Sequence, residues 1–218
     1  MKNNILISDF DGTMTRFDFY DLVCRAFPDI AGDFWHQYER GEITHFEALR
    51  SIFAGIRSSE AKLLSIIEAM QIDPDLPQAV AELRGHGWDV VVASAGCDWY
   101  IKRLLAAQKV NIMVHANPGD FFADQGLLMR LPPASPLFSA ELGVNKVAVV
   151  REALKNSSCV AFAGDGRPDL APALLVPAHR RFAKSWLAKK LQEIGEEFKP
   201  FDDWHEVSRM LIEQEGCS

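Results

Sequence analysis

Short apolar runs alternate with amphipathic helical segments along most of this 218-residue chain. Four runs have the composition of buried strands, at residues 4–9, 88–94, 111–115 and 159–164. Helical periodicity follows near 78–85, 98–108 and 145–155. Two further β runs at 120–130 flank a Gln-Gly pair and predict a hairpin. Because parallel strands need long crossovers, the alternation predicts an α/β fold, a parallel sheet with helices on both faces.

One long stretch departs from this alternation. Over residues 17–70 the apolar side chains recur only at helical spacing. Residues 72–77 (IDPDLP) contain two prolines and predict a hinge. We therefore expect a helical cap, residues 15–77, inserted after the first strand of a core made of residues 1–14 and 78–218.

The charge and the cysteine content limit which partners we expect the protein to bind and in which compartment we expect it. The 23 basic and 30 acidic residues give a net charge of −7. This argues against nucleic acid and anionic membranes, because both need a positive surface. No apolar run approaches the roughly 20 residues of a membrane span, and the first apolar run is too short for a signal peptide. Four cysteines without CxxC spacing indicate reduced thiols. We expect a cytoplasmic monomer or homodimer.

The first strand ends in two carboxylates, Asp9 and Asp11, on either side of Phe10. In extended backbone, side chains two residues apart face the same side. Close carboxylates repel, so such a site favours a divalent metal or a raised pKa. Gly12 permits a sharp turn whose backbone N–H groups can hold an anion. For this motif alone, an Asp-Gly turn that merely closes a strand is the better alternative.

Two later positions add groups suited to phosphate. Ser94-Ala95-Gly96 ends the second strand, where a hydroxyl and open backbone donors suit a phosphate oxygen. Ser94 as a simple helix N-cap is the alternative. Lys146 begins a predicted helix, and a cation there opposes the helix dipole unless an anion lies beside it. A solvated surface lysine is the alternative.

The fourth strand ends in Gly164-Asp165-Gly166, and a second acid, Asp169, follows. Oxygen ligands of this kind suit Mg²⁺. The alternative is a glycine turn, with Asp169 in the first turn of a helix that starts at Pro168. In open α/β sheets the active groups collect at the carboxyl ends of the strands. We therefore expect all these side chains at one edge of the sheet.

As a set, these motifs resemble those of the haloacid dehalogenase superfamily of phosphotransferases. The resemblance is carried by Asp9-Phe10-Asp11-Gly12-Thr13, Ser94, Lys146 and Gly164-Asp165-Gly166-x-x-Asp169. It covers nearly the whole chain and implies a Rossmann-like core, a small helical cap, Mg²⁺ and a phosphoaspartyl intermediate. The dehalogenases of the superfamily lack the second acid, so Asp11 indicates a phosphatase.

The resemblance also implies a role for each residue. Asp9 is the expected nucleophile, and Asp11 protonates the leaving oxygen and then takes a proton from water. Lys146 neutralises Asp9 and the transferring oxygens. The expected phosphate-binding residues are Phe10, Ser94, Ala95, Gly96 and Lys146. The expected metal-binding residues are Asp9, Asp11, Asp165 and Asp169, with Asp169 orienting the metal shell or Lys146.

The substrate is indicated by the predicted cap. Phosphoserine phosphatases resemble this layout, but they place Glu at the position of Asp18 and Arg near Phe53, where Arg50 or Arg57 would have to substitute. The chain looks more like the methionine-salvage phosphatases that act on 2-hydroxy-3-keto-5-methylthiopentenyl-1-phosphate, although the cysteine-rich stretch of Bacillus-type members is absent before Lys146. The expected substrate contacts are Asp18, Phe19, Tyr20 and Phe53.

We therefore expect a Mg²⁺-dependent phosphomonoesterase for a small phosphorylated metabolite. A phosphoserine phosphatase is one alternative. A phosphomutase or phosphotransferase, and a non-catalytic phosphate sensor, are alternatives from other classes. Two groups of residues are expected to be structural. The six histidines form no metal-binding pair and are expected at the surface or with satisfied partners. The basic residues between Arg180 and Lys190 predict a solvated helix face.

Overall fold

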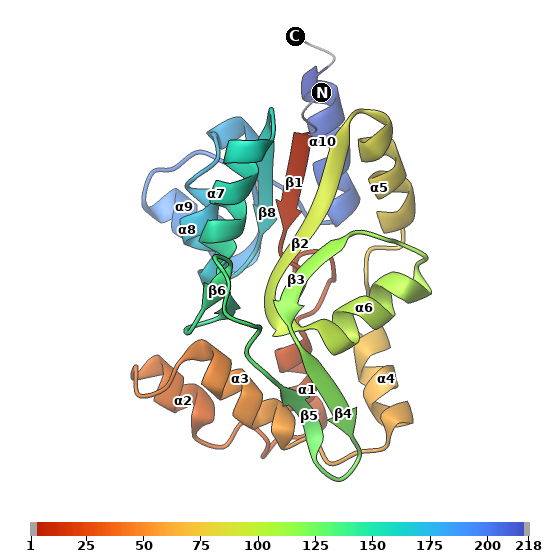
Figure 1. Cartoon of the computed structure of the whole chain (residues 1–218), viewed down its shortest axis with the longest axis vertical. Helices are drawn as coiled ribbons and strands as arrows, with labels where there is room; N and C mark the ends of the chain where they lie inside the picture. Colours follow the sequence, from red (N-terminus) through yellow and green to blue (C-terminus); the bar gives the residue numbers. More distant parts are fainter. Residues whose placement is uncertain (1–3, 216–218) are drawn as a thin grey trace.

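The computed structural model describes residues 4–215, with a six-stranded parallel sheet at the centre (Figure 1). The strands lie in the order β10-β9-β8-β1-β2-β3. Their bounds are Asn4–Ser8 for β1, Trp88–Cys97 for β2, Met113–Asn117 for β3, Val160–Gly164 for β8, Arg181–Ala183 for β9 and Lys199–Pro200 for β10. Every neighbouring pair is parallel. The predicted α/β class is therefore confirmed.

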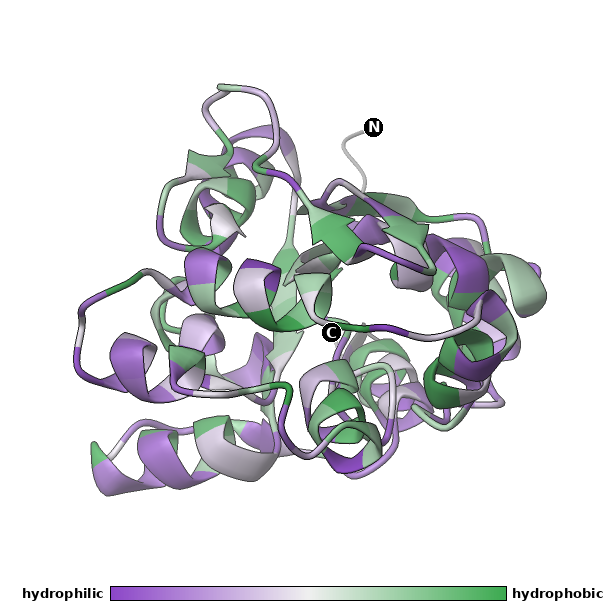
Figure 2. Cartoon of the chain, turned by 90° about the horizontal axis from the view of Figure 1, so that it is seen from below, coloured by the Kyte–Doolittle hydropathy of each residue, from purple (hydrophilic) through white to green (hydrophobic). Residues whose placement is uncertain are grey.

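Alternate residues of the strands pack into two separate hydrophobic cores. Leu6 of β1 belongs to one core and Ile7 to the other, because successive side chains of a strand point to opposite faces. The first core is covered by α5 (Leu76–Gly85), α6 (Asp98–Ala107) and α10 (Trp204–Glu215). The second is covered by α7 (Lys146–Asn156), α8 (Leu170–Ala173) and α9 (Ser185–Glu193). Figure 2 shows apolar central elements between helices whose outer faces are hydrophilic.

Four helices lie between β1 and α5, the helix that leads into β2, and Figure 1 shows these four beyond the carboxyl ends of the central strands. They are α1 (Phe19–Ala26), α2 (Phe34–Glu39), α3 (His45–Ala54) and α4 (Glu60–Glu68). The chain enters and leaves this group side by side. Thr15 and Ile72 form an isolated antiparallel bridge, and the Arg16 N–H donates to the carbonyl oxygens of Met70 and Gln71, each at 3.0 Å. These contacts tie both ends of the insertion together beside β1.

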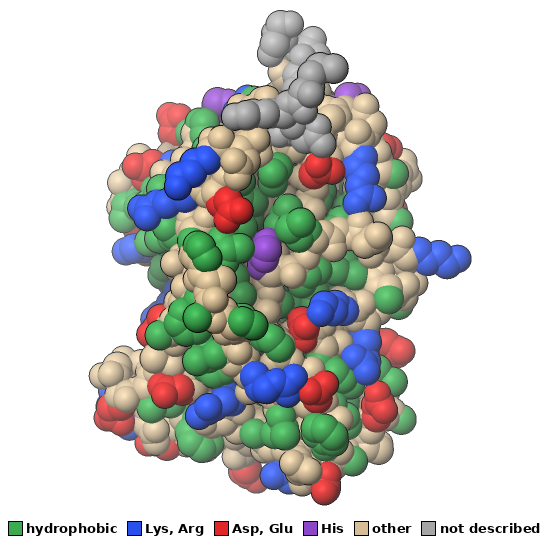
Figure 3. Space-filling model, in the orientation of Figure 1, with side chains coloured by type: hydrophobic (Ala, Val, Ile, Leu, Met, Phe, Trp, Pro, Cys, Tyr) green, Lys and Arg blue, Asp and Glu red, His purple; other side chains and the backbone are tan. Residues whose placement is uncertain are grey.

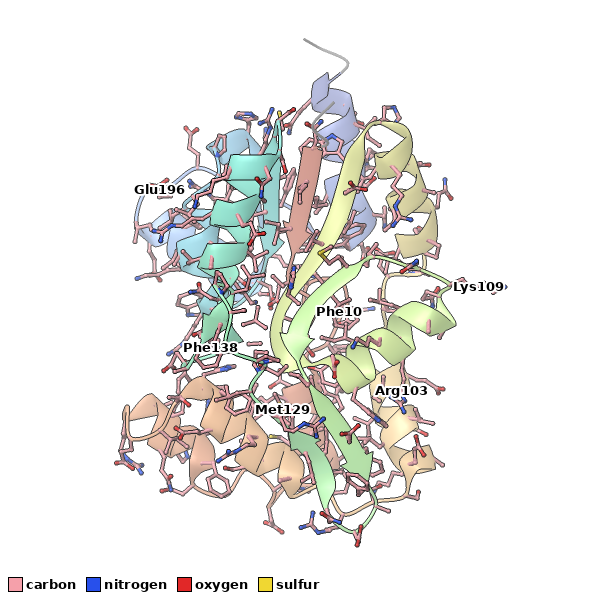
Figure 4. The ribbon with its side chains drawn as sticks, viewed as in Figure 1. Phe10, Arg103, Lys109, Met129, Phe138 and Glu196 are labelled. Carbon is pink, nitrogen blue, oxygen red and sulfur yellow. The ribbon has the colours of Figure 1, made fainter. Side chains whose placement is uncertain are left out.

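The hairpin predicted at 120–130 is present as the antiparallel pair β4 (Gly119–Phe122) and β5 (Gly126–Met129). It packs against α3. Gly126 has a φ of +87°, and a Cβ built there would lie 2.6 Å from the carbonyl oxygen of Ala54, so only glycine fits. A second antiparallel pair, β6 (Phe138–Ser139) and β7 (Gly143–Val144), leads into α7. Figure 4 labels Met129 in β5 and Phe138 in β6, and both lie beside the insertion.

Strands β9 and β10 were not expected. The prediction of a solvated helix face between residues 180 and 190 is wrong for its first residues, because residues 181–183 form a buried strand. Arg181 lies in β9 and is 5% exposed. Its guanidinium donates to the carbonyls of Ala173 and Val176 and pairs with Glu196. Burying a charged group requires such partners. Strand β9 has only three residues, too few to show a period of two in the sequence.

Charged side chains of both signs are interspersed with apolar ones over the face shown in Figure 3. On this face, neither sign of charge forms a continuous area. Across residues 4–215, none of the helices has the length and apolar character that a membrane crossing requires.

Candidate active site

The residues singled out at the strand ends meet at the carboxyl edge of the sheet. Asp9 follows β1, Ser94 lies in β2, Asp165 follows β8, and Lys146 begins α7. Because β1 pairs with both β2 and β8, these ends are neighbours in space. Phe10, labelled in Figure 4, lies at the same edge.

One pocket at this edge joins the sheet to the helical insertion. In the described part of the chain it is lined by Asp9, Asp11, Asp18, Tyr20, Trp35, His45, Leu49, Phe53, Ser94, Ala95, Gly96, Tyr100, Lys146, Asp165, Gly166 and Pro168. The expected contacts Phe10, Phe19 and Asp169 are not among them. Phe10 and Phe19 are completely buried. The Phe19 ring packs beneath the pocket, with its centroid 4.4 Å from that of Tyr100 and 5.0 Å from that of Phe53.

Lys146 lies between two carboxylates and is only 2% exposed. Its Nζ is 2.9 Å from Oδ1 of Asp9 and 2.7 Å from Oδ1 of Asp169. Burial alone would lower the pKa of Lys146. The carboxylates of Asp169 and Asp9 raise this pKa by more than burial lowers it, so the net change is upward. The lysine is therefore a cation held in place beside Asp9.

Asp9 is fixed by two donors that act on the same oxygen. Its Oδ1 accepts hydrogen bonds from the Phe10 N–H, at 2.7 Å, and from Lys146. The pKa of Asp9 is raised well above its ordinary value, first by burial and then by the Asp169 carboxylate, against the opposing effect of Lys146. Burial and the Asp169 carboxylate together therefore outweigh the effect of Lys146 on the pKa of Asp9.

Asp169 has both carboxylate oxygens occupied. Oδ1 accepts the bond from Lys146, and Oδ2 accepts from the N–H groups of Asp165 and Gly166 at 3.1 and 2.9 Å. The side chain is completely buried. These contacts hold the lysine and the loop that carries Asp165.

Asp11 faces two hydroxyl donors. Its Oδ2 accepts from Tyr100 Oη at 2.9 Å and from Ser94 Oγ at 3.2 Å, whereas Oδ1 is buried without a partner. Burial raises the pKa of Asp11 to about 6, and the two hydroxyl bonds limit the rise. Gly12 then turns the chain at a φ of +67°, as predicted. A carboxyl with a pKa near 6 can give and take a proton close to neutral pH.

Two buried side chains that support the site were missed. Tyr100 lies in the first turn of α6, where its apolar spacing resembles that of any core residue. Asn117, at the end of β3, donates from Nδ2 to the carbonyl oxygens of Ala95 and Leu142, at 2.7 and 2.9 Å. It ties the Ser94 loop to the segment that precedes Lys146. The only sequence signal for Asn117 is an amide at a strand end.

The insertion side of the pocket is aromatic. Asp18 caps α1 by accepting from the Tyr20 N–H, and burial followed by the nearby Asp11 raises its pKa to about 7. The Tyr20 ring stacks on Trp35, with centroids 4.4 Å apart. Arg50 and Arg57 do not line the pocket, so neither takes the place of the arginine expected near Phe53 in a phosphoserine phosphatase.

Comparison with known proteins shows to which family the chain belongs. Residues 6–173, more than half of the chain, match the haloacid dehalogenase-like hydrolases. The chain belongs to this family. The resemblance seen in the motifs and the predicted hydrolase class are therefore confirmed.

Two curated relatives of this haloacid dehalogenase-like hydrolase match over most of its length. A 2-hydroxy-3-keto-5-methylthiopentenyl-1-phosphate phosphatase from Brevibacillus brevis is 25% identical over 220 residues, covering 98% of each chain. Its namesake from Bacillus velezensis is 24% identical over 213 residues, covering 94% of this chain and 88% of the relative.

Solved structures share the fold of this haloacid dehalogenase-like hydrolase. A substrate-bound phosphoserine phosphatase superposes with a TM-score of 0.65 at 15% identity, covering 96% of this chain and 98% of that one. A haloacid dehalogenase family hydrolase from Salmonella enterica serovar Typhi gives 0.68 at 18% identity, covering 92% and 67%. At these identities the likeness concerns the fold alone.

Mg²⁺ is the metal expected for this haloacid dehalogenase-like hydrolase, and the side chains present fit it. Oxygens of Asp9, Asp165 and Asp169 lie within 4.8 Å of one another. Hard carboxylate oxygens are the ligands that Mg²⁺ prefers. Because Lys146 is the sole lysine or arginine among the lining residues, a divalent cation would offset the remaining negative charge.

Mg²⁺ is expected to raise the melting temperature of the metal-free protein more at pH 8 than at pH 5.5. Burial and then Asp169 raise the pKa of Asp165 from 3.8 to about 7. A carboxyl raised in this way destabilises the fold as pH climbs between the two values, and it binds metal only when ionised. At a hundredfold excess over Kd the gain is about 2.7 kcal/mol, or roughly 5–10 °C, measured by thermal unfolding.

The Asp165→Asn variant should lose most of this gain. Asp120→Asn is the matched control, because Asp120 lies on β4 with its side chain 56% exposed and paired with Arg130. An equal Mg²⁺ shift in Asp165→Asn and the control would contradict the metal site.

Proposed function

We propose that this protein is a Mg²⁺-dependent phosphomonoesterase that acts through an aspartyl-phosphate intermediate on 2-hydroxy-3-keto-5-methylthiopentenyl-1-phosphate or a close analogue. The observation that carries the proposal is the placing of Asp9, Asp11 and Lys146 around one pocket, each with the partner its role needs. The names of the two curated relatives, which match along most of the chain, support the substrate.

The first half of the proposed reaction forms the aspartyl phosphate. The Asp9 orientation is fixed by the two donors on Oδ1, so we assign the attack on phosphorus to Oδ2. As the bond from Oδ2 to phosphorus forms, the bond to the leaving oxygen breaks. Asp11 gives its proton to that oxygen, and we assign this proton to the unpartnered Oδ1. Lys146 and the hydroxyl of Ser94 stabilise the charge on the transferring oxygens.

The second half regenerates the enzyme. Ionised Asp11 takes a proton from a water molecule, whose oxygen attacks phosphorus and releases inorganic phosphate and the free Asp9 carboxylate. Asp169 keeps Lys146 beside Asp9 in both steps. Asp9 and Asp165 are among the residues that would hold Mg²⁺, and the chemistry supplied by the metal would be positive charge beside the transferring phosphoryl oxygens.

We propose that residues 15–77 form a cap over this site and supply the contacts to the leaving group. Tyr20, Trp35 and Phe53 give that side of the pocket an aromatic lining. Phosphoserine would present a carboxylate there, and the described lining offers it no cation beyond Lys146. Desolvating an unpaired charge costs several kcal/mol, so the pocket favours an uncharged leaving group.

Phosphate release from a panel of esters tests the proposal. We expect Mg²⁺-dependent release, with kcat/KM for 2-hydroxy-3-keto-5-methylthiopentenyl-1-phosphate at least about tenfold above that for phosphoserine, which corresponds to 1.4 kcal/mol. The panel also includes other small phosphate monoesters. A preference for phosphoserine would contradict the assigned substrate. Release from no ester, with or without Mg²⁺, would contradict the phosphatase function and favour a mutase or a phosphate sensor.

A further inference from the structure

His45 was expected to be a surface or satisfied histidine, and the structure shows that this is wrong. It lines the active-site pocket, and its Nδ1 is buried without a hydrogen-bond partner. Leaving a buried polar atom unpaired costs about 1–3 kcal/mol. Such an exception in a folded protein therefore calls for an explanation.

The backbone holds His45 firmly at the start of α3. Thr44 and Glu47 form a capping box there. The His45 N–H donates to Oε1 of Glu141 at 3.1 Å, and the next N–H donates to the Glu141 carbonyl oxygen at 2.9 Å. Glu141 lies between β6 and β7, in the segment that leads to Lys146. The position of the imidazole is thus tied to the catalytic side of the pocket.

Two aromatic rings surround the imidazole. Its centroid lies 5.9 Å from Trp35 and 5.3 Å from Tyr38, and both contacts are T-shaped. An N–H group directed at an aromatic ring makes a weak hydrogen bond. A hydrogen on the enclosed Nδ1 is compatible with this aromatic surrounding, and it leaves Nε2 as an acceptor. Burial, followed by the charge of Lys146, lowers the pKa of His45 to about 4, so the ring is neutral.

His45 is the polar member of a row along α3. His45, Leu49 and Phe53 are spaced four residues apart and therefore share one face of the helix. All three line the pocket. This face offers a ligand one neutral polar group followed by two apolar side chains. It matches a leaving group that carries a hydroxyl on an otherwise apolar chain.

We propose that His45 determines substrate specificity by accepting, at Nε2, a hydrogen bond from a hydroxyl group of an uncharged leaving group. The inference rests on the proposed phosphatase function and adds to it the chemical feature that the cap side recognises. A single neutral hydrogen bond in such a pocket changes affinity by up to about tenfold.

Two esters that differ only in one hydroxyl test this role: butyl phosphate and 2-hydroxybutyl phosphate. The wild-type protein should favour the hydroxylated ester by about fivefold to tenfold in kcat/KM. His45→Phe keeps a ring of similar shape without nitrogen, and it should bring the ratio close to one because only the hydroxylated ester loses a contact. His45→Gln, which retains an acceptor, should recover part of the preference. His36→Phe is the control, because His36 lies in the same insertion with its side chain 67% exposed.

The outcomes separate the two proposals. Loss of the preference in His45→Phe but not in His36→Phe, with an unchanged melting temperature, supports the role of His45. An unchanged ratio, or an equal loss on both esters, overturns it and leaves the phosphatase function intact. Hydrolysis of neither ester by the wild-type protein, together with no release from any ester of the panel, overturns both proposals.

Discussion

The Asp9→Asn variant is expected to release phosphate at least about a thousandfold more slowly than the wild-type protein, a barrier increase of more than about 4 kcal/mol. An amide oxygen is a poor nucleophile and cannot form the acyl phosphate. The loss should appear in kcat with every ester, because it affects the phosphoryl group and not the leaving group. Steady-state kinetics and trapping of phosphoprotein from a labelled ester would measure it.

Stability separates this loss from unfolding. Asn has the shape of Asp, and the pKa of Asp9 is raised by burial and by neighbouring carboxylates. Removing its charge should therefore leave the metal-free melting temperature unchanged or higher. Asp120→Asn should match the wild-type protein in both measurements. Undiminished phosphate release by a folded Asp9→Asn protein would contradict the proposed mechanism.

Replacing Lys146 by Met should reduce both activity and stability. Removing one partner from a buried charge pair typically costs about 3–5 kcal/mol, and Lys146 faces both Asp9 and Asp169. Loss of a preorganised positive group at the phosphoryl oxygens should lower kcat by about a hundredfold to a thousandfold. Denaturant unfolding and phosphate release measure the two effects.

A double variant distinguishes the two roles of this lysine. Lys146→Met leaves the carboxylates of Asp9 and Asp169 without their cation, and adding Asp169→Asn removes one of these two charges. The double variant should therefore be more stable than Lys146→Met but no more active. Lys155→Met, in the last turn of the same helix, is the control for the loss of a lysine from α7. Equal activity of Lys146→Met and Lys155→Met would show that Lys146 takes no part in the reaction.

The sequence was sufficient to predict which strand ends bring their polar side chains together at one edge of the sheet. Asp9, Ser94 and Asp165 each follow a short apolar run, and parallel strands place such ends together. Lys146 was singled out as a cation at a helix start, and its role was implied by the resemblance of the whole set of motifs to the family. These predictions depend on local patterns along the chain, and local patterns are what a single sequence displays.

The supporting residues could not be found in the same way. Tyr100 and Asn117 act through contacts with segments distant in the sequence, and nothing beside them in the chain marks those partners. His45 is separated by 101 positions from Lys146, and its role depends on how α3 packs over the sheet. Arg181 is the first residue of the three-residue strand β9, and a charged residue at that position does not indicate a buried strand. Tertiary packing, not periodicity, decides each of these cases.

The bridge between Thr15 and Ile72 has a consequence for how such an enzyme can change over generations. The chain enters and leaves the insertion at two paired segments, and paired strands lie roughly 5 Å apart. The ends of the insertion are therefore as close together as the ends of a tight turn. The entropy of closing a loop grows only with the logarithm of its length. A gene could therefore exchange this one contiguous stretch for a longer or shorter one, acquiring a new preference for substrate while the phosphoryl-transfer machinery is inherited unaltered.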